Sequence, residues 1–376
     1  ENLNWAATNS EYVDFVIAPD TVDVPVVSAS RPFNNGTQTS DWETVEGKWT
    51  VVDTGVAATE NGVTRAGNNY TATITLNSDY QWNMESIPGN VTIVGKVATV
   101  TYSITAIDID TDSVEKDANY KDENGNNLYY TGNELGSLTL KFGGVTLKEG
   151  RDYIVSITRD SKPADDVKYV GRYVITVTGN GNYTGTHTFE EFIIDQQTVN
   201  VPKFTNANFN YTGSDIYGTY NSNPLYKVDE GNSVSAKYAG EEGYVIFTLE
   251  NYENYKWGTT ENLSGDHNEN VKVAFVVTPA PVAKPEVVYK DAQGNIVGGF
   301  VYNAGNYTIT ITGVENYMTP YAGNVYTAQS ANTYTVKYTL DPNYKWNDGD
   351  TKNYVELTWT IATDNTNKVN IFLGDN

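Results

Sequence analysis

Apolar and polar residues alternate along the chain with a period of two, and no stretch shows a convincing helical period of 3.6. In segment 70–76 the even-numbered residues are Tyr, Ala, Ile and Leu, and the odd-numbered residues are all Thr. In segment 355–361, Val, Leu, Trp and Ile alternate in the same way with Glu and Thr. One apolar and one polar face are typical of antiparallel strands in a sheet that packs on a second sheet. The pattern therefore predicts an all-β protein.

A four-residue motif recurs after strands that end in Leu: Asn or Asp, then Tyr, then Lys or Gln, then Trp. Its copies lie at 79–82, 254–257 and 343–346. Trp257 and Trp346 are 89 residues apart, and Trp82 and Trp257 are 175 residues apart, close to two such periods. A repeat without this Trp must therefore lie between them. It keeps Asn182-Tyr183 but has Gly185 at the Trp position.

The closing strands of the repeats set the predicted domain boundaries. We expect the end of a truncated repeat at 1–18 and a polar tail at 364–376. Between them we expect a first repeat at 19–106, a second at 107–195, a third at 196–279 and a fourth at 280–363. Several short strands per repeat, separated by Gly and Asn turns, favour β-sandwiches. A propeller would need repeats of about 40–45 residues.

An aromatic residue followed by Asn or Thr and then Gly recurs near the start of the repeats, at 33–36, 129–132 and 209–213. We call this the tip motif. Its composition is typical of turns, because Gly, Asn and Thr tolerate or stabilise turn conformations.

Two of these segments resemble known repeat families. Segment 171–185, preceded by Gly-Arg-Asp-Tyr-Ile-Val at 150–155, resembles bacterial immunoglobulin-like repeats. Segments 343–349 and 355–361 resemble a sister repeat type. Both types occur in tandem in large surface proteins of Gram-positive, often gut-dwelling, bacteria. The resemblance implies tandem immunoglobulin-like β-sandwich domains in an elongated array, outside the cell or on its wall, that serve as a stalk or adhesive arm. Neither a signal peptide nor a wall-anchoring motif is seen in this sequence.

Composition excludes several classes of protein. The 376 residues carry 24 Lys and Arg against 47 Asp and Glu, a net charge of −23. Nucleic-acid binding is excluded because it needs a basic face. The absence of Cys excludes disulfides, thiolate nucleophiles and Cys-ligated zinc. We expect no membrane insertion, because no apolar run approaches 18 residues. We also expect a monomer, with a host or cell-surface glycan or protein as the candidate partner.

Two groups of aromatic residues are candidates for different roles. Residues that recur at the same point of each repeat are interpreted as fold-defining core residues, and a sugar-stacking platform is the alternative. These are Tyr80, Trp82, Tyr255, Trp257, Tyr344 and Trp346, with Trp359 on a closing strand. Trp42 and Trp49 have no counterpart in other repeats, and they flank an acidic stretch. We take them as the candidate glycan-binding pair, against local packing.

The acidic segment Asp108, Asp110 and Asp112 offers alternate oxygen ligands of the kind that Ca²⁺ prefers. It fails as an EF-hand, because the sixth position is not Gly and the twelfth is Asn119. A solvated acidic linker is the competing interpretation.

No enzyme is predicted and no cofactor beyond calcium, since the acids are scattered and only His187 and His267 are available for general acid–base catalysis. The sequence thus predicts a non-enzymatic structural or adhesive stalk. The alternatives are a carbohydrate- or host-protein-binding module, or accessory domains of a secreted glycan-degrading enzyme.

Overall fold

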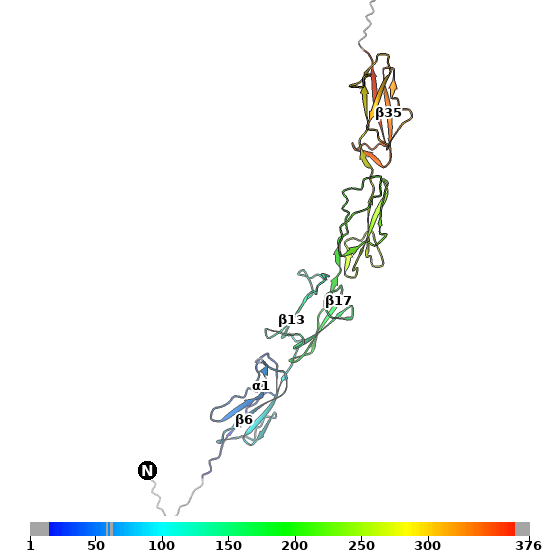
Figure 1. Ribbon diagram of the computed structural model, residues 1–376. Coiled ribbons are helices and arrows are strands. Elements are labelled where there is room, and N and C mark those ends of the chain that lie inside the picture. The colour runs from blue at the N-terminus through cyan, green and yellow to red at the C-terminus, as the bar shows by residue number, and fades with distance from the viewer. Residues whose placement is uncertain (1–14, 58, 61–62, 365–376) are drawn as a thin grey trace, which may run out of the picture. The chain divides into compact units, whose positions relative to one another are not determined.

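The computed structural model describes residues 15–57, 59–60 and 63–364. The chain divides into two compact units, Glu1–Gln197 and Thr198–Asn376. In the described residues the only helix is α1 (Thr54–Ala57), which is four residues long. The all-β prediction is therefore confirmed (Figure 1). Most of the predicted truncated repeat and nearly all of the predicted tail lie outside the described residues.

In the first repeat, a five-stranded sheet runs in the order β2-β9-β6-β3, and β8 also pairs with β9. Chain without regular secondary structure covers the other side of the core. Its buried residues Val24, Val27, Phe33 and Trp42 pack in one cluster with buried residues of β6 and β9. The elements are β1 (Asp20–Val22), β2 (Ser30–Pro32), β3 (Trp49–Asp53), β4 (Thr59–Glu60), β5 (Val63–Thr64), β6 (Gly67–Leu76), β7 (Tyr80–Trp82), β8 (Val91–Val94) and β9 (Val97–Thr105).

The second repeat has two substantial sheets, one in the order β12-β20-β17-β15-β16, with β19 on β17, and one in the order β11-β13-β14. Its strands are β10 (Ile107–Asp108), β11 (Val114–Asn119), β12 (Leu128–Tyr129), β13 (Ser137–Phe142), β14 (Val145–Thr146), β15 (Tyr153–Arg159), β16 (Lys162–Ala164), β17 (Gly171–Gly179), β18 (Tyr183–Thr184), β19 (Thr186–Thr188) and β20 (Phe192–Asp195).

The third repeat resembles the first in having one main sheet, β22-β24-β27-β26 with β23 on β24. Its strands are β21 (Gln197–Val199), β22 (Tyr226–Lys227), β23 (Ser233–Val234), β24 (Glu242–Leu249), β25 (Tyr255–Trp257), β26 (Leu263–Ser264) and β27 (Asn270–Val276).

The fourth repeat has two four-stranded sheets, β30-β29-β32-β34 and β31-β37-β35-β33. Buried residues of both sheets form one core, so this repeat is a β-sandwich. Its strands are β28 (Ala280–Val282), β29 (Glu286–Lys290), β30 (Ile296–Val297), β31 (Phe300–Val301), β32 (Tyr307–Thr312), β33 (Met318–Pro320), β34 (Thr327–Ala328), β35 (Asn332–Leu340), β36 (Tyr344–Trp346) and β37 (Tyr354–Ala362).

The long strands follow the alternation read from the sequence. In β6, Ala72, Ile74 and Leu76 are buried, whereas the threonines between them are more exposed. In β37, Val355, Trp359 and Ile361 are buried and the Glu and Thr residues beside them are exposed. One face of each strand therefore builds the core and the other meets water.

One predicted strand is not formed in the part that the structure describes. Residues 15–17 belong to the strand expected to close the truncated repeat, but they are in no strand, and Phe15, Val16 and Ile17 are exposed. A closing strand forms by pairing with a central strand of its own repeat, and no described residue pairs with this segment. The truncated repeat at 1–18 stays a prediction, because residues 1–14 lie outside the described part of the chain.

Candidate functional site

Every repeat carries the same parallel pairing between a short segment near its start and the end of its closing strand. β2 pairs with β9, β12 with β20 and β31 with β37, and in the third repeat Asn210 pairs with Thr278. The bonds are equivalent. The backbone N–H of Phe33, Tyr130, Tyr211 and Tyr302 donates to the carbonyl of Thr105, Asp195, Thr278 and Ala362, at 2.8–2.9 Å. We call this pairing the terminal clamp.

The tip motif positions one half of each clamp. Its aromatic residue supplies the donating N–H, and the next residue then starts a turn held by its own side chain. Asn34 and Asn303 accept through Oδ1, and Thr131 and Thr212 through Oγ1, from the N–H two residues later. Such Asx and ST turns explain why Asn or Thr follows the aromatic residue.

The recurrent Tyr-x-Trp motif is a short strand that pairs in parallel with the opening strand of its own repeat. β1 pairs with β7 and β28 with β36 in this way, and the second repeat pairs β10 with β18. Trp82, Trp257 and Trp346 are 5%, 4% and 2% exposed, so no ring face is available to a sugar. Trp359 is fully buried, whereas Tyr80, Tyr255 and Tyr344 are half-buried.

Gly185 of the second repeat stands where the other repeats carry the Trp, in a backbone conformation that favours Gly. Gly185 has φ +75°, and a Cβ at this position would lie 1.9 Å from Oδ1 of Asp108. Asp108 belongs to the opening strand β10, which pairs with β18 directly before Gly185. The Asp108 carboxylate therefore occupies the space next to the backbone where the other repeats carry a Trp side chain.

The Asn-Tyr part of the motif connects a repeat to the one before it. In the first unit, the N–H of Ala66 donates to Oδ1 of Asn182 at 2.8 Å, and the rings of Phe33 and Tyr183 pack edge to face at 5.8 Å and 77°. The carbonyl of Asn182 accepts from Ile107, in the opening strand of its own repeat. Asn182 thus belongs to the second repeat and bonds both to the first repeat and to the opening strand that follows the connection between them.

The second unit repeats this junction. The N–H of Ala239 donates to Oδ1 of Asn343 at 2.9 Å, and the rings of Tyr211 and Tyr344 pack edge to face at 5.4 Å and 79°. The carbonyl of Asn343 accepts from Ala280, in the opening strand of the fourth repeat. The same contacts in two separate units show that the motif itself encodes this junction.

Trp42 and Trp49 do not form an exposed aromatic platform. Trp42 is 7% exposed, and its Nε1 donates to the carbonyl of Pro25 at 3.0 Å. Trp49 is half-buried against Trp82, and its Nε1 donates to the carbonyl of Glu43. Trp42 covers the open side of the single sheet, which is a packing role. The structure therefore gives no support to these two residues as a glycan-binding pair.

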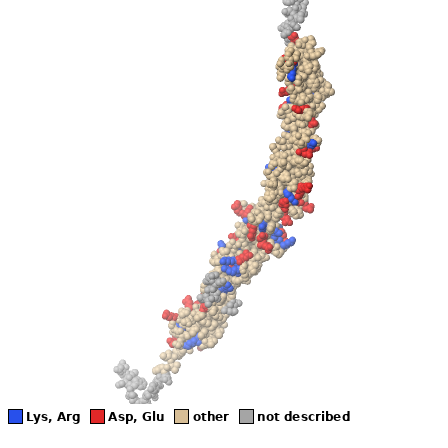
Figure 2. Space-filling view, in the orientation of Figure 1, with Lys and Arg blue, Asp and Glu red and all other residues tan. Residues whose placement is uncertain are grey.

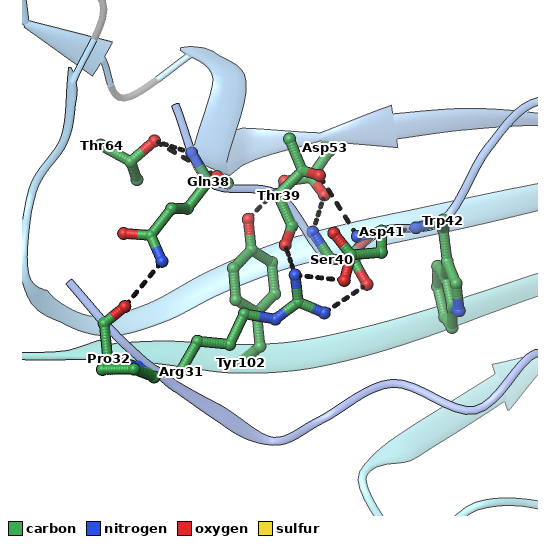
Figure 3. Close-up of polar contacts among 10 residues, drawn as sticks. All are labelled: Arg31, Pro32, Gln38, Thr39, Ser40, Asp41, Trp42, Asp53, Thr64 and Tyr102. Atoms are coloured by element: carbon green, nitrogen blue, oxygen red, sulfur yellow. Dashed lines mark hydrogen bonds and ion pairs between the residues drawn. The ribbon is translucent and has the colours of Figure 1, made fainter. Parts of the chain in front are cut away.

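A polar network holds the chain around Trp42 onto the sheet (Figure 3). The Arg31 guanidinium donates to the carbonyls of Thr39 and Ser40 and pairs with the carboxylate of Asp41 at 2.6 Å. The carboxylate of Asp53 accepts from the backbone N–H of Ser40 at 2.6 Å and from the Tyr102 hydroxyl at 2.6 Å. These bonds fix the segment that replaces a second sheet.

Asp53 and Tyr102 have shifted pKa values because of this contact. Burial acts to raise the pKa of the Asp53 carboxyl, but the hydrogen bonds from Ser40, Tyr102 and Gly55 outweigh it and hold the pKa below its usual value. Burial, and then the hydrogen bond to Asp53, raise the pKa of Tyr102. At neutral pH the pair is therefore a carboxylate that accepts a hydrogen bond from a neutral phenol.

The acidic turn at 108–114 surrounds a lysine. The Lys116 ammonium donates to four backbone carbonyls, those of Ile109, Asp110, Thr111 and Val114, at 2.8–3.4 Å. The ring of His187 contacts the Asp110 carboxylate through Nδ1. Lys116 thus occupies the backbone carbonyls of this turn, and calcium at the carboxylates of Asp108, Asp110 and Asp112 stays a prediction. Within residues 15–57, 59–60 and 63–364, no group of three or more His, Asp or Glu side chains is placed to hold a metal.

The second repeat also contains a groove of about 490 Å³ beside the β15–β16 hairpin. Tyr169 lies along it with 40% of its surface exposed. Arg159 and Lys168 lie 5.2 and 5.6 Å from the centre of its ring. The groove is lined by Arg159, Asp160, Lys162, Pro163, Ala164, Asp165, Asp166, Tyr169 and Tyr173. With Lys168 beside it, the site has three cationic and three anionic side chains.

Sequence reasoning overlooked this groove, the Lys116 turn and the Asn contacts between repeats. For the Asn contacts the sequence did contain a signal. Asn directly precedes Tyr at both 182 and 343, so the Asn recurs in the motif just as the Trp does. Lys116 and the groove residues do not recur, so no pattern in the sequence distinguishes them from other charged surface residues.

Comparisons with known proteins do not assign the chain to a family. No protein-family model matches the chain, and the comparison with curated proteins also gives no match. Among solved structures, the chain is similar to SGBP-B of the mixed-linkage glucan utilization locus of Bacteroides ovatus, in complex with a mixed-linkage heptasaccharide. The identity is 12%, the match covers 67% of this chain and 71% of that one, and the TM-score is 0.15. A TM-score this low carries no argument about function.

The described residues contain no helix of the length and apolar character needed to cross a membrane. On the face seen in Figure 2, acidic side chains are spread over both units with basic ones interspersed, and no continuous basic surface is visible.

Proposed function

We propose that the chain is a non-enzymatic stalk of an extracellular bacterial surface protein, built from tandem immunoglobulin-like repeats. The observation that carries the proposal is the terminal clamp. In each clamp a segment near the start of the repeat runs parallel to the end of its closing strand. Tension on the two ends of a repeat then pulls the paired segments in opposite directions along their length. All the hydrogen bonds of the clamp are loaded together instead of opening one by one.

The short connections between repeats support the same role. A single residue separates β9 from β10, and a single residue separates β20 from β21. Three residues separate β27 from β28, and they include Thr278, which is itself part of a clamp, and Pro279. Chain this short has little slack to take up under tension. The resemblance to immunoglobulin-like repeats of Gram-positive surface proteins agrees with an exposed, load-bearing position.

Pulling the chain by its two ends in a single-molecule force experiment tests the proposal. Thr278→Pro removes the N–H that donates to the Phe209 carbonyl in the third clamp. We expect one unfolding event to move to lower force in this variant. Thr278→Ala keeps that N–H, and its unfolding force should stay close to that of the unmodified chain. Equal forces in the two variants would show that the clamp does not bear the load, and the stalk proposal would lose its main support.

The groove beside Tyr169 favours a second candidate function, the binding of a neutral saccharide. A sugar presents apolar C–H faces, which pack on aromatic rings, and hydroxyls, which both donate and accept hydrogen bonds. Tyr169 offers a partly exposed ring. The carboxylates of Asp165 and Asp166 make no hydrogen bond or ion pair among the described residues and can accept from hydroxyls. A site with balanced charges in a chain of net charge −23 suits an uncharged ligand better than an ionic one.

A glycan array probed with the full chain tests this function. Tyr169→Ala should weaken binding to the glycans that the unmodified chain retains by up to about tenfold, the upper range for one aromatic contact. Tyr169→Phe should keep most of the affinity. Tyr238→Ala is the matched control, because Tyr238 is also exposed and also lies under a lysine, Lys237, but does not line this groove. Binding that Tyr238→Ala reduces as much as Tyr169→Ala would place the ligand elsewhere.

A further inference from the structure

The groove of the second repeat is in contact with the terminal clamp of the same repeat. Tyr130, whose N–H donates to the carbonyl of Asp195 in the clamp, is buried. Its ring stacks on that of Tyr169, with 6.3 Å between the centroids and 19° between the planes, a favourable distance for two aromatic rings. The N–H of Leu135 also donates to the carbonyl of Val167 at 2.8 Å. The half of the clamp near the start of the repeat therefore supports the ring of Tyr169.

The closing strand β20 is the other half of the clamp, and it supports the backbone of Tyr169 by a separate route. Phe192, the first residue of β20, stacks on the buried ring of Tyr173 at 5.4 Å and 8°. The Tyr173 hydroxyl in turn accepts from the N–H of Tyr169 at 3.1 Å and donates to its carbonyl at 2.8 Å. The ring of Tyr169 is thus held by one half of the clamp, and its backbone is held by the other half.

We infer that tension on the second repeat regulates saccharide binding in this groove. When load moves the two halves of the clamp apart, the ring and the backbone of Tyr169 lose their common support, and the affinity for the saccharide falls. This inference rests on the proposed saccharide site and on the proposed load on the clamp. The coupling is reciprocal, because a saccharide that binds only the closed repeat stabilises the closed clamp by the same free energy.

Tyr130 is a positioning residue for this site. It does not line the groove, so its ring acts on a saccharide only through Tyr169. Tyr130→Leu removes the ring and keeps both an apolar side chain and the N–H that donates to Asp195. We expect this variant to lower the affinity of the groove by up to about tenfold, the upper range for one aromatic pair.

Pulling the full chain by its two ends without any saccharide tests the coupling between clamp and groove. Tyr130→Leu and Tyr169→Ala each remove one ring of the stack, and each should move the same unfolding event to lower force. The double variant should move it no further than the larger single change, because both substitutions remove one contact. Ile154→Ala, at an exposed position of β15, is the control and should leave the force unchanged. Additive reductions, or no reduction, would overturn the inference.

Pulling in the presence of a saccharide tests the reciprocal effect. The probe is the neutral oligosaccharide that the full chain retains most strongly on a glycan array, added at saturating concentration. It should move the same unfolding event to higher force in the unmodified chain and in Ile154→Ala, but not in Tyr169→Ala. An unfolding force that the bound oligosaccharide leaves unchanged would show that load does not regulate the groove.

The glycan array itself separates the inference from the function on which it rests. Tyr130→Leu should weaken retention of the neutral glycans, whereas Tyr130→Phe, which keeps the ring, should keep most of the affinity. Unchanged retention by Tyr130→Leu would overturn the regulation and leave the saccharide site standing. An array that retains no neutral glycan would remove the saccharide function and its regulation together, and the force measurements without saccharide would still decide whether the clamp and the groove are coupled.

Discussion

Replacing Trp346 with Ala is expected to lower the free energy of unfolding of the fourth repeat by about 3–5 kcal/mol, the usual cost of emptying a large aromatic site in a core. Trp346 is 2% exposed and belongs to the cluster that joins the two sheets of this repeat. Denaturant unfolding followed by hydrogen exchange of peptides from residues 280–363 would measure the loss. A change below about 1 kcal/mol would mean that the ring contributes little to the core, and a ligand-stacking role would have to be reconsidered.

A comparison of two Trp→Phe variants sharpens this prediction. The indole N–H of Trp346 is buried and has no hydrogen-bond partner among the described residues, whereas that of Trp257 donates to the carbonyl of Glu269 at 2.8 Å. Trp346→Phe removes an unsatisfied donor, but Trp257→Phe removes one of the two hydrogen bonds that the Glu269 carbonyl accepts, the other coming from the N–H of Leu249. We therefore expect Trp257→Phe to cost about 1 kcal/mol more than Trp346→Phe. Equal costs would show that the two indoles do not differ in this way.

Replacing Asp53 with Ala is expected to destabilise the first repeat by about 3 kcal/mol or more at neutral pH. The carboxylate accepts from Ser40 N–H, the Tyr102 hydroxyl and Gly55 N–H, and its loss leaves these donors unpaired in a partly buried site. Each unsatisfied buried donor costs about 1–3 kcal/mol. Denaturant unfolding of the full chain, followed in peptides from residues 19–106, gives the value.

The lowered pKa of Asp53 also predicts that the stability of the first repeat falls at acid pH. Its pKa in the folded chain lies below the value of about 3.9 for an unfolded Asp. Its contribution to stability is therefore fully present above about pH 4 and is lost as the pH falls through the folded pKa. Asp53→Asn should flatten this part of the acid dependence in the first repeat. Glu46→Gln, at an exposed position of the same repeat, is the control and should leave it unchanged. An unaltered acid profile in Asp53→Asn would contradict the assignment.

Local patterns in the sequence predicted the parts of the fold that depend on the nearest neighbours along the chain. Alternation with a period of two placed the inward residues of β6 and β37, because successive side chains of a strand point to opposite faces wherever that strand pairs. Trp82, Trp257 and Trp346, which recur at one point of the repeats, were predicted as core residues and are buried. By contrast, Trp42 and Trp49 were predicted to bind a glycan because other repeats have no counterpart of them. The lack of a counterpart says nothing about whether a side chain is buried.

What the sequence by itself determined is thus which faces of the strands are apolar and where turns interrupt them. Only the tertiary structure decided which distant segments meet. The clamp joins Phe33 to Thr105, and the junction joins Ala66 to Asn182. The Lys116 ammonium donates hydrogen bonds to four backbone carbonyls of one turn, whereas a lysine on an open strand would face water. A polar group forms a bond with whichever partner the folded backbone brings within reach, and that partner is fixed by the register of strands far apart in sequence rather than by the local pattern.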